Sequence, residues 1–285
     1  MRTGSVRRPR PIPGVRLHAV LATWNEADVV GATVGNALEQ GCEAVHLLDN
    51  GSDDGTDEVA RAAGAHVLEV FRTDRYDGRA NQRRINAAIE DLSRAAGAAQ
   101  VWWLLLDADE LVEGPDGTTI RGLIDRLDRS IRVVGSRTIN HYPRAEHPIE
   151  AGADPRGFPT NAQERRGVSC RAGHWKHPLV RWDAAGPPVI PQRGAHVASS
   201  SRRLLEPPVS LVTHHYPYRN PEVTRERLAR LSARLDGEPW AMGRRAANAD
   251  AVYREAYAEV DAHDMVGPGE VLAPRPRPAV RTRPA

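Results

Sequence analysis

Two patterns of apolar residues alternate along the first 110 positions of the chain. Short, nearly continuous apolar runs, typical of strands buried on both faces of a parallel sheet, occur at residues 15–22, 44–48, 65–70 and 101–106. Between them, apolar residues recur at helical spacing over residues 28–40, 56–63 and 79–96. This alternation predicts stacked βαβ units, with the C-terminal ends of the strands on one edge of the sheet.

The pattern is looser after Glu110. A helix is expected over residues 119–127, a strand over 131–139, a helix opening with a proline over 221–235, and another helix over 244–261. Residues 142–192 are rich in Pro, Gly, His and Arg, with only short apolar pieces such as 178–182. We therefore expect an irregular C-terminal half, in which loops of this length are usually functional or covering elements.

Polar side chains follow three of the predicted strands. They are Asn25 and Glu26 after the first strand, Asp49 and residues 52–54 after the second, and residues 107–110 after the fourth. Singly, each segment is more typical of a turn or a helix cap. Together, on the sheet edge where α/β proteins bind ligands, they predict a nucleotide site. Asp107 and Asp109 are spaced to surround one divalent cation that takes its other ligands from a phosphate.

A basic segment opens the helix expected over residues 79–96. Arg79, Arg83 and Asn86 are spaced to share one face of this helix, and a helix start with arginines favours anions. The alternative interpretation is a solvated charged face.

Composition restricts the class of protein further. The chain has 285 residues, 40% of them hydrophobic and 27% charged, which is ordinary for one large α/β domain. Its net charge of +2 comes largely from arginines at the two ends, so nucleic-acid binding by the body of the protein is not indicated. Two cysteines argue against a disulfide framework, and no apolar stretch approaches about 20 residues. We expect a cytoplasmic protein without a transmembrane segment.

Several segments resemble the motifs of family 2 glycosyltransferases. Residues 22–26 (Ala-Thr-Trp-Asn-Glu) and 47–56 (Leu-Leu-Asp-Asn-Gly-Ser-Asp-Asp-Gly-Thr) resemble the family's opening motifs. Residues 106–110 (Leu-Asp-Ala-Asp-Glu) resemble its metal-binding DxD motif. Residues 82–88 (Gln-Arg-Arg-Ile-Asn-Ala-Ala) resemble a segment of relatives that act on lipopolysaccharide core sugars. The resemblance covers residues 15–112 and resumes weakly at 176–181, 194–196 and 214–219.

The resemblance implies a glycosyltransferase-A fold, a Rossmann-like α/β architecture with a mostly parallel sheet and helices on both of its faces. A nucleotide-sugar-binding half at residues 15–112 would continue into an irregular acceptor-side half at 113–265. A disordered basic arm at 1–14 and a disordered Pro/Arg tail at 266–285 would flank this single domain.

The resemblance also implies roles for individual residues. The nucleotide-sugar would contact Thr23, Trp24, Asn25, Glu26, Asp49, Asn50, Ser52, Arg79, Gln82, Arg84, Asp107 and Ala108. Glu26 would lie near the ribose, and Asp49 would accept a hydrogen bond from the base, expected to be uracil. Asp109 would bind Mn²⁺ or Mg²⁺ at the diphosphate, Asp107 would approach the ribose or the metal, and His215 would contact the metal or the diphosphate. The implied reaction is an inverting transfer of a sugar from a UDP-linked donor to a hydroxyl of a glycan, a lipid-linked molecule or a small molecule.

The sequence departs from the family pattern at the general base. Many relatives carry an acidic residue well after the DxD motif, but the segment around His196 reads Gly-Ala-His-Val-Ala. We expect Asp109, Asp183 and His196 to be catalytic, with Asp183 and His196 as candidates for the base; Glu206 and Glu164 are further candidates.

Two other functions are compatible with parts of the pattern. A sugar nucleotidyltransferase also uses paired metal-binding carboxylates, but residues 23–26 lack the glycine and positive charge that cradle a triphosphate. A non-catalytic nucleotide-sugar or glycan-binding protein would explain the missing base, although the Asp107/Asp109 pair argues against it.

Overall fold

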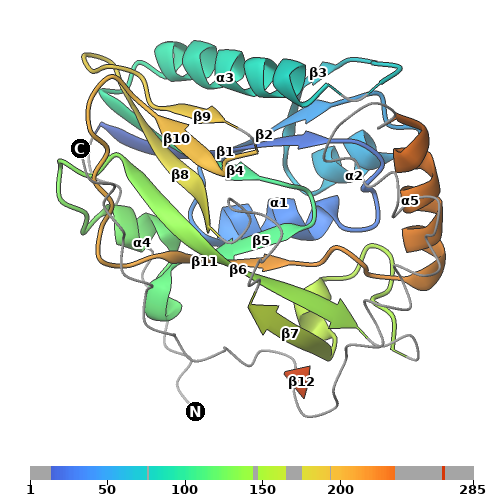
Figure 1. The fold of residues 1–285 in the computed structure, drawn as a ribbon. Helices are drawn as coiled ribbons and strands as arrows, with labels where there is room; N and C mark the ends of the chain where they lie inside the picture. Colours follow the sequence, from blue (N-terminus) through green and yellow to red (C-terminus); the bar gives the residue numbers. More distant parts are fainter. Residues whose placement is uncertain are drawn as a thin grey trace, which may run out of the picture.

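The computed structural model describes residues 14–75, 77–143, 147–164, 175–192, 194–234 and 265–266. A central sheet of ten strands runs in the order β12-β7-β6-β8-β4-β1-β2-β3, with β11 beside β6 and β5 beside β11 (Figure 1). The strands are β1 (Val15–Thr23), β2 (Ala44–Asp49), β3 (His66–Val70), β4 (Gln100–Leu106), β5 (Glu110–Glu113), β6 (Val133–Pro143), β7 (Thr160–Glu164), β8 (Trp175–Asp183), β11 (Leu211–His215) and β12 (Met265–Val266). The short strands β9 (Ile190–Gln192) and β10 (Val197–Ser199) form a separate pair.

Five α-helices accompany the strands within the described part of the chain. They are α1 (Val30–Glu39), α2 (Thr56–Ala62), α3 (Gly78–Ala95), α4 (Ile120–Ile124) and α5 (Pro221–Arg234). Two 3₁₀ turns, η1 (Pro115–Gly117) and η2 (Pro155–Gly157), lie in loops.

The predicted βαβ units are confirmed. Strands β3, β2, β1 and β4 are parallel neighbours, and Leu21 of β1 lies opposite both Leu47 of β2 and Leu106 of β4. Both faces of this sheet are apolar because helices cover both (Figure 1). Helices α1, α2 and α4 pack against one face, and α3 packs with the β9–β10 pair against the other.

The second half contains more regular structure than its composition predicted. Strand β8 falls in the segment expected to be irregular, yet it lies between β4 and β6 and pairs antiparallel with both. Its register with β6 shifts, so that Val134 lies opposite Leu179 while Ser136 lies opposite Lys176. The shift places Pro178 at a bulge, where the missing N–H of proline interrupts no ladder hydrogen bond. Lys176, Pro178 and Arg181 interrupt the apolar pattern of this strand, so the sequence did not predict it.

The other elements of this half match the expectations to different degrees. Helix α5 confirms the helix predicted at 221–235, while α4 is shorter than predicted, and β6 covers the strand predicted at 131–139. Strands β5 and β11, which the sequence did not suggest, pair with each other antiparallel. The helix expected at 244–261, the arm at 1–13 and the tail beyond 266 lie outside the described residues. None of the helices in the described ranges is long and apolar enough to cross a bilayer.

Candidate active site

The loops after β1, β2 and β4 meet at one edge of the sheet, as the motif order predicted. The loop after β1 is held by the loop after β2: the N–H of Asn25 donates to Ser52 Oγ (2.9 Å), and Asn25 and Asp53 exchange hydrogen bonds of 2.8 and 3.0 Å. Asn25 has a positive φ of 53°, a conformation that asparagine tolerates better than most residues. The local sequence therefore fixes the chain direction where it leaves the core.

Residues 107–110 form a tight turn after β4. The N–H of Glu110 donates to the carbonyl of Asp107 (3.1 Å), and Thr33 of α1 donates its hydroxyl to the carbonyl of Ala108. The side chains of this turn diverge. Asp107 and Glu110 both accept hydrogen bonds from Lys176 Nζ, whereas Asp109 joins a separate cluster.

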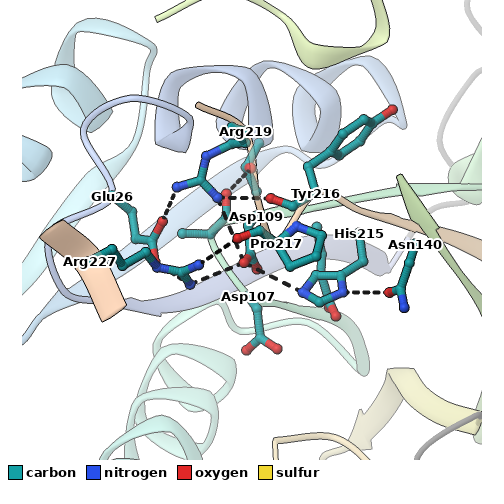
Figure 2. Close-up of polar contacts among 12 residues, drawn as sticks. Glu26, Asp107, Asp109, Asn140, His215, Tyr216, Pro217, Arg219 and Arg227 are labelled. Atoms are coloured by element: carbon teal, nitrogen blue, oxygen red, sulfur yellow. Dashed lines mark hydrogen bonds and ion pairs between the residues drawn. The ribbon is translucent and has the colours of Figure 1, made fainter. Parts of the chain in front are cut away.

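Asp109 is the centre of a buried charged cluster (Figure 2). Its Oδ2 lies 3.5 Å from His215 Nε2, 3.2 Å from Arg227 and 3.8 Å from Arg219. Burial alone would raise the pKa of Asp109, but His215, Arg227 and Arg219 outweigh burial and hold the pKa well below its usual range. Asp109 is therefore ionised at neutral pH. The two arginines also bind Glu26, each at 2.7 Å, so the segments that carry them are tied to the loop after β1.

The orientation of His215 follows from its second ring nitrogen. Nδ1 lies 2.8 Å from Asn140 Oδ1, and the amide of Asn140 donates to the hydroxyl of Tyr142 (2.9 Å). Because the amide oxygen of Asn140 can only accept, Nδ1 carries a proton and donates it to Asn140. Nε2 therefore faces the carboxylate of Asp109; metal-binding histidines are commonly oriented in this way, by a hydrogen bond at the other ring nitrogen.

A cleft of about 860 Å³ opens over this cluster. Its lining comes from the loops after β1, β2 and β4, from the start of α3 and from α5. The predicted site residues that line it are Thr23, Trp24, Asn25, Glu26, Asn50, Gln82, Asp107, Ala108, Asp109 and His215. The volume falls in the range of small-molecule and cofactor sites.

Four residues predicted to contact the nucleotide-sugar do not line this cleft. Asp49 is 1% exposed, and both of its carboxylate oxygens accept hydrogen bonds from Ser52, so the two residues support the loop rather than face a base. Arg84 lies over the ring of Phe71 and binds Glu69 at 2.5 Å. Arg79 is exposed and also stays outside the cleft lining. Asn50 replaces Asp49 at the cleft wall because the strand ends between them.

Asp183, one of the candidates for the general base, lies away from the cleft. Asp183 lies at the opposite end of β8, paired with Gln100 at the start of β4, and it binds Arg132 (2.8 Å) and Arg181 (2.9 Å). Gln100 and Asp107 are seven residues apart along the extended chain, which corresponds to about 23 Å at 3.3 Å per residue. The expectation for Asp183 is therefore wrong on geometric grounds.

Two further candidates for the general base, His196 and Glu206, do not line the cleft either. His196 follows Gly194 but does not itself line the cleft. Glu206 binds His177 at 3.1 Å and stays outside the lining, and the side chain of Glu164 lies outside what the structure describes.

Three important cations of the site were missed in the sequence. Arg219 lies in the segment 214–219, where the family resemblance resumes weakly, but neither Arg219 nor Arg227 stands out among the other arginines of the sequence. Lys176 carried a signal that was overlooked: it is the only lysine among 39 basic residues. It is also almost fully buried, which is rare for lysine unless a partner compensates its charge.

The structure is an α/β protein with a cleft over the carboxyl ends of parallel strands, and carboxylates, an imidazole and arginines line this cleft. Comparison with known proteins gives the family. The model of the family described as "Glycosyl transferase family 2" matches residues 19–176, more than half of the chain. The chain belongs to glycosyl transferase family 2, and its architecture is that of the glycosyltransferase-A fold.

Individual relatives match a smaller part of the chain than the family model does. The chain is 31% identical over 124 residues to glycosyltransferase AglJ of Haloferax volcanii, which covers 43% of this chain and 36% of the relative. The chain thus spans about a third of the length of this curated relative.

Solved structures with local similarity include two phosphoglycerate-glycosylating enzymes. Glucosyl-3-phosphoglycerate synthase from Mycobacterium tuberculosis, solved with Mn²⁺, UDP and glucosyl-3-phosphoglycerate, is 19% identical, with a TM-score of 0.29 and coverage of 43% of this chain and 44% of that chain. Mannosyl-3-phosphoglycerate synthase from Rubrobacter xylanophilus is 22% identical, with a TM-score of 0.28 and coverage of 43% and 40%.

Proposed function

We propose that this protein is a metal-dependent, inverting glycosyltransferase that moves a sugar from a UDP-linked donor to an acceptor hydroxyl. The observation that supports this most directly is the pairing of Asp109 with His215 at the floor of the cleft, 3.5 Å apart. The proposal rests on this geometry together with membership of the family.

The donor set suits a Mn²⁺ or Mg²⁺ ion. Carboxylate and imidazole are ligands that such metals accept, and Asp109 is ionised while His215 presents Nε2. Among the residues described, no group of three or more His, Cys, Asp or Glu side chains is placed to hold a metal alone. Two protein ligands fit a cation that takes its others from water and from the donor diphosphate. When bound, such an ion would neutralise charge on the departing diphosphate.

The walls of the cleft suit the nucleoside part of the donor. Thr23 Oγ1 is buried without a hydrogen-bond partner in the described part of the chain, so it is available to a ligand. Trp24 and Asn25 continue the wall from Thr23, and Asn50 lies on the neighbouring loop, where we propose that it meets the base in place of Asp49. Gln82 at the start of α3 completes this side.

The reacting end of the cleft combines an anion-binding cation with a candidate base. Arg227 lines the cleft beside Asp109, where its charge would stabilise the leaving diphosphate. Glu226 lines the cleft on the same helix, and its nearest cation is exposed Arg230 at 3.8 Å. The other carboxylates of the lining are held by buried cations or by turn hydrogen bonds. We therefore propose Glu226 as the group that removes the proton of the acceptor hydroxyl.

We propose that the two halves of the chain, residues 15–112 and 113–265, bind different substrates but do not fold as separate units. The sheet is continuous across it, since β8 from the second half pairs with β4 from the first. The second half contributes α5 and the loop at Ala151 and Gly152 to the lining, and we propose that the acceptor, a glycan, a lipid-linked molecule or a small molecule, enters on this side.

Release of UDP from UDP-sugars tests the proposed activity. We expect release to require Mn²⁺ or Mg²⁺ and to fall by at least about 10³-fold in Asp109→Asn, because the variant loses the ligand charge that anchors the metal. The control is the thermal unfolding of both proteins, since stabilisation by Mn²⁺ plus UDP should be confined to the wild type. Metal-independent release, or full activity in a folded Asp109→Asn protein, would contradict the proposal. Conversion of a triphosphate to a nucleotide-sugar would favour the nucleotidyltransferase alternative, and binding without turnover would favour the non-catalytic one.

A further inference from the structure

Lys176 occupies an unusual position behind the cleft. Its ammonium group lies 2.6 Å from Asp107 Oδ2 and 2.5 Å from Glu110 Oε1, and its side chain is only 5% exposed. Lys176 lies on β8, Asp107 directly follows β4, and Glu110 opens β5, so one side chain links three strands. The strong attraction of both carboxylates keeps the pKa of Lys176 above its usual value, although burial acts in the opposite direction.

The turn at residues 107–110 separates the two aspartates of the DxD motif. Asp107 and Glu110, at its first and last positions, both contact Lys176, while Asp109 contacts His215 and the arginines. In Figure 2 the carboxylate of Asp107 points away from the cluster around Asp109. The motif therefore presents its two carboxylates in different electrostatic surroundings, although they are one residue apart.

The two aspartates also differ in exposure. The side chain of Asp107 is 55% exposed and lines the cleft, whereas that of Asp109 is 7% exposed. Asp107 thus keeps access to a ligand while one of its oxygens is bound to the ammonium group. A carboxylate neutralised in this way is a poor ligand for a divalent cation, because the cation and the ammonium group compete for the same charge.

We propose that Lys176 is a positioning residue that withholds Asp107 from the metal and orients it as a hydrogen-bond acceptor for a hydroxyl of the donor. Resting on the proposed function, this assigns the metal to Asp109 and His215. For Asp107 it favours the first of the two roles that the resemblance implied, contact with a hydroxyl of the donor rather than with the metal. Asp107 contributes to donor affinity through the hydroxyl, and Lys176 sets the direction of its carboxylate.

The single lysine allows the contact itself to be measured in the wild-type protein. With ¹⁵N-lysine labelling, one side-chain ammonium resonance is expected, protected from solvent exchange by burial and by its two carboxylate partners. Asp107→Asn should shift this resonance strongly, and Asp109→Asn should shift it much less. A resonance that exchanges as fast as free lysine, or that Asp107→Asn leaves unchanged, would overturn the positioning role whatever the protein catalyses.

The consequence for the metal is tested by titrating Mn²⁺ into the protein–UDP complex. We expect Asp109→Asn to weaken Mn²⁺ binding by about tenfold or more, while Asp107→Asn changes it little and weakens UDP-sugar binding instead. Equal losses of Mn²⁺ affinity in the two variants, with wild-type binding intact, would overturn the inference. Absence of Mn²⁺ binding in the wild type would instead refute the proposed function and the metal assignment together.

A double-mutant cycle tests whether Lys176 is the reason why Asp107 does not bind the metal. Lys176→Met combined with Glu110→Gln removes the buried pair together, so that no buried carboxylate is left without its cation. In this background Asp107 is released, and we expect Asp107→Asn to weaken Mn²⁺ binding, which it does not do in the wild type. Additive effects of Asp107→Asn in the two backgrounds would contradict the role of Lys176.

Discussion

At the scale of single residues, four aspartate side chains make four different sets of contacts in this protein. Asp49 holds a loop through Ser52, Asp107 pairs with a buried lysine, Asp109 faces His215, and Asp183 binds two arginines at the far end of the sheet. Their chemistry is identical, so the difference comes from the cations that the fold places beside each of them. Of these four aspartates, Asp107 and Asp109 line the cleft, whereas Asp49 and Asp183 do not.

A matched pair of variants tests this distinction. Asp183→Asn should lower the free energy of unfolding by roughly 1–3 kcal/mol, because Arg132 and Arg181 lose a charged partner, while kcat stays near the wild-type value. Glu226→Gln, at an exposed helix position, should leave stability unchanged and lower kcat by about 10²–10⁴-fold if Glu226 is the base.

Urea denaturation and initial-rate kinetics on both variants give the answer. A strong loss of kcat in a stably folded Asp183→Asn protein would restore Asp183 as a catalytic candidate. A wild-type kcat in the Glu226→Gln variant would exclude Glu226 as the general base.

At the scale of elements, Arg219 connects the end of β11 to the loop after β1. Its guanidinium binds Asp28 at 2.7 and 2.9 Å and Glu26 at 2.7 Å, and it donates to the carbonyl of Tyr216 at 2.9 Å. The side chain is 3% exposed, so these bonds are protected from solvent. The segment leading into α5 is thereby fixed to the first half of the chain across about 190 residues.

Replacing Arg219 should therefore loosen α5 and its contribution to the cleft. We expect Arg219→Met to lower the free energy of unfolding by about 3–5 kcal/mol, because Asp28 is left without its buried cation and Glu26 keeps only Arg227. The control is Arg94→Met, since Arg94 forms an exposed pair with Glu90 one turn away on α3 and should contribute only about 0.3–0.5 kcal/mol. Similar losses in the two variants would show that the Arg219 cluster does not stabilise the fold.

At the scale of the whole molecule, stability depends on histidines that burial keeps neutral. His46 of β2 lies against His18 of β1 and beside Trp103 of β4, and burial, with smaller contributions from the neighbouring histidines, lowers its pKa to about 4. In the unfolded chain the pKa of histidine is about 6.5. The unfolded state therefore binds a proton at a higher pH than the folded state does.

The sign of the resulting pH dependence follows directly. As the pH falls from about 6.5 towards 4, protons bind the unfolded state first, and the free energy of unfolding decreases by at most about 1.4 kcal/mol per pH unit for each such histidine. We expect His46→Phe to flatten this slope while leaving stability near pH 8 largely unchanged. Urea denaturation at several pH values measures the slope, and parallel profiles for the two proteins would contradict the assignment.

The predictable part of this fold is the part built from neighbouring residues in the sequence. Strands β1 to β4 and helices α1 to α3 follow from apolar periodicity, because each buries its apolar face against the next unit along the chain. The parallel arrangement then places Asn25, Asn50 and Asp109 at one edge, so the location of the site also follows from the order of the motifs.

The tertiary structure alone decided which side chains meet within that site. Strand β8 pairs with β4, a strand about 80 residues earlier in the chain, and the proline and buried charges of β8 interrupt its apolar pattern in the sequence. The contacts of Lys176 with Asp107, of His215 with Asp109 and of Arg219 with Glu26 each join residues that are distant in the chain. A sequence determines elements through short-range periodicity, whereas the strength of an ion pair depends on distances and burial that exist only after the strands have assembled.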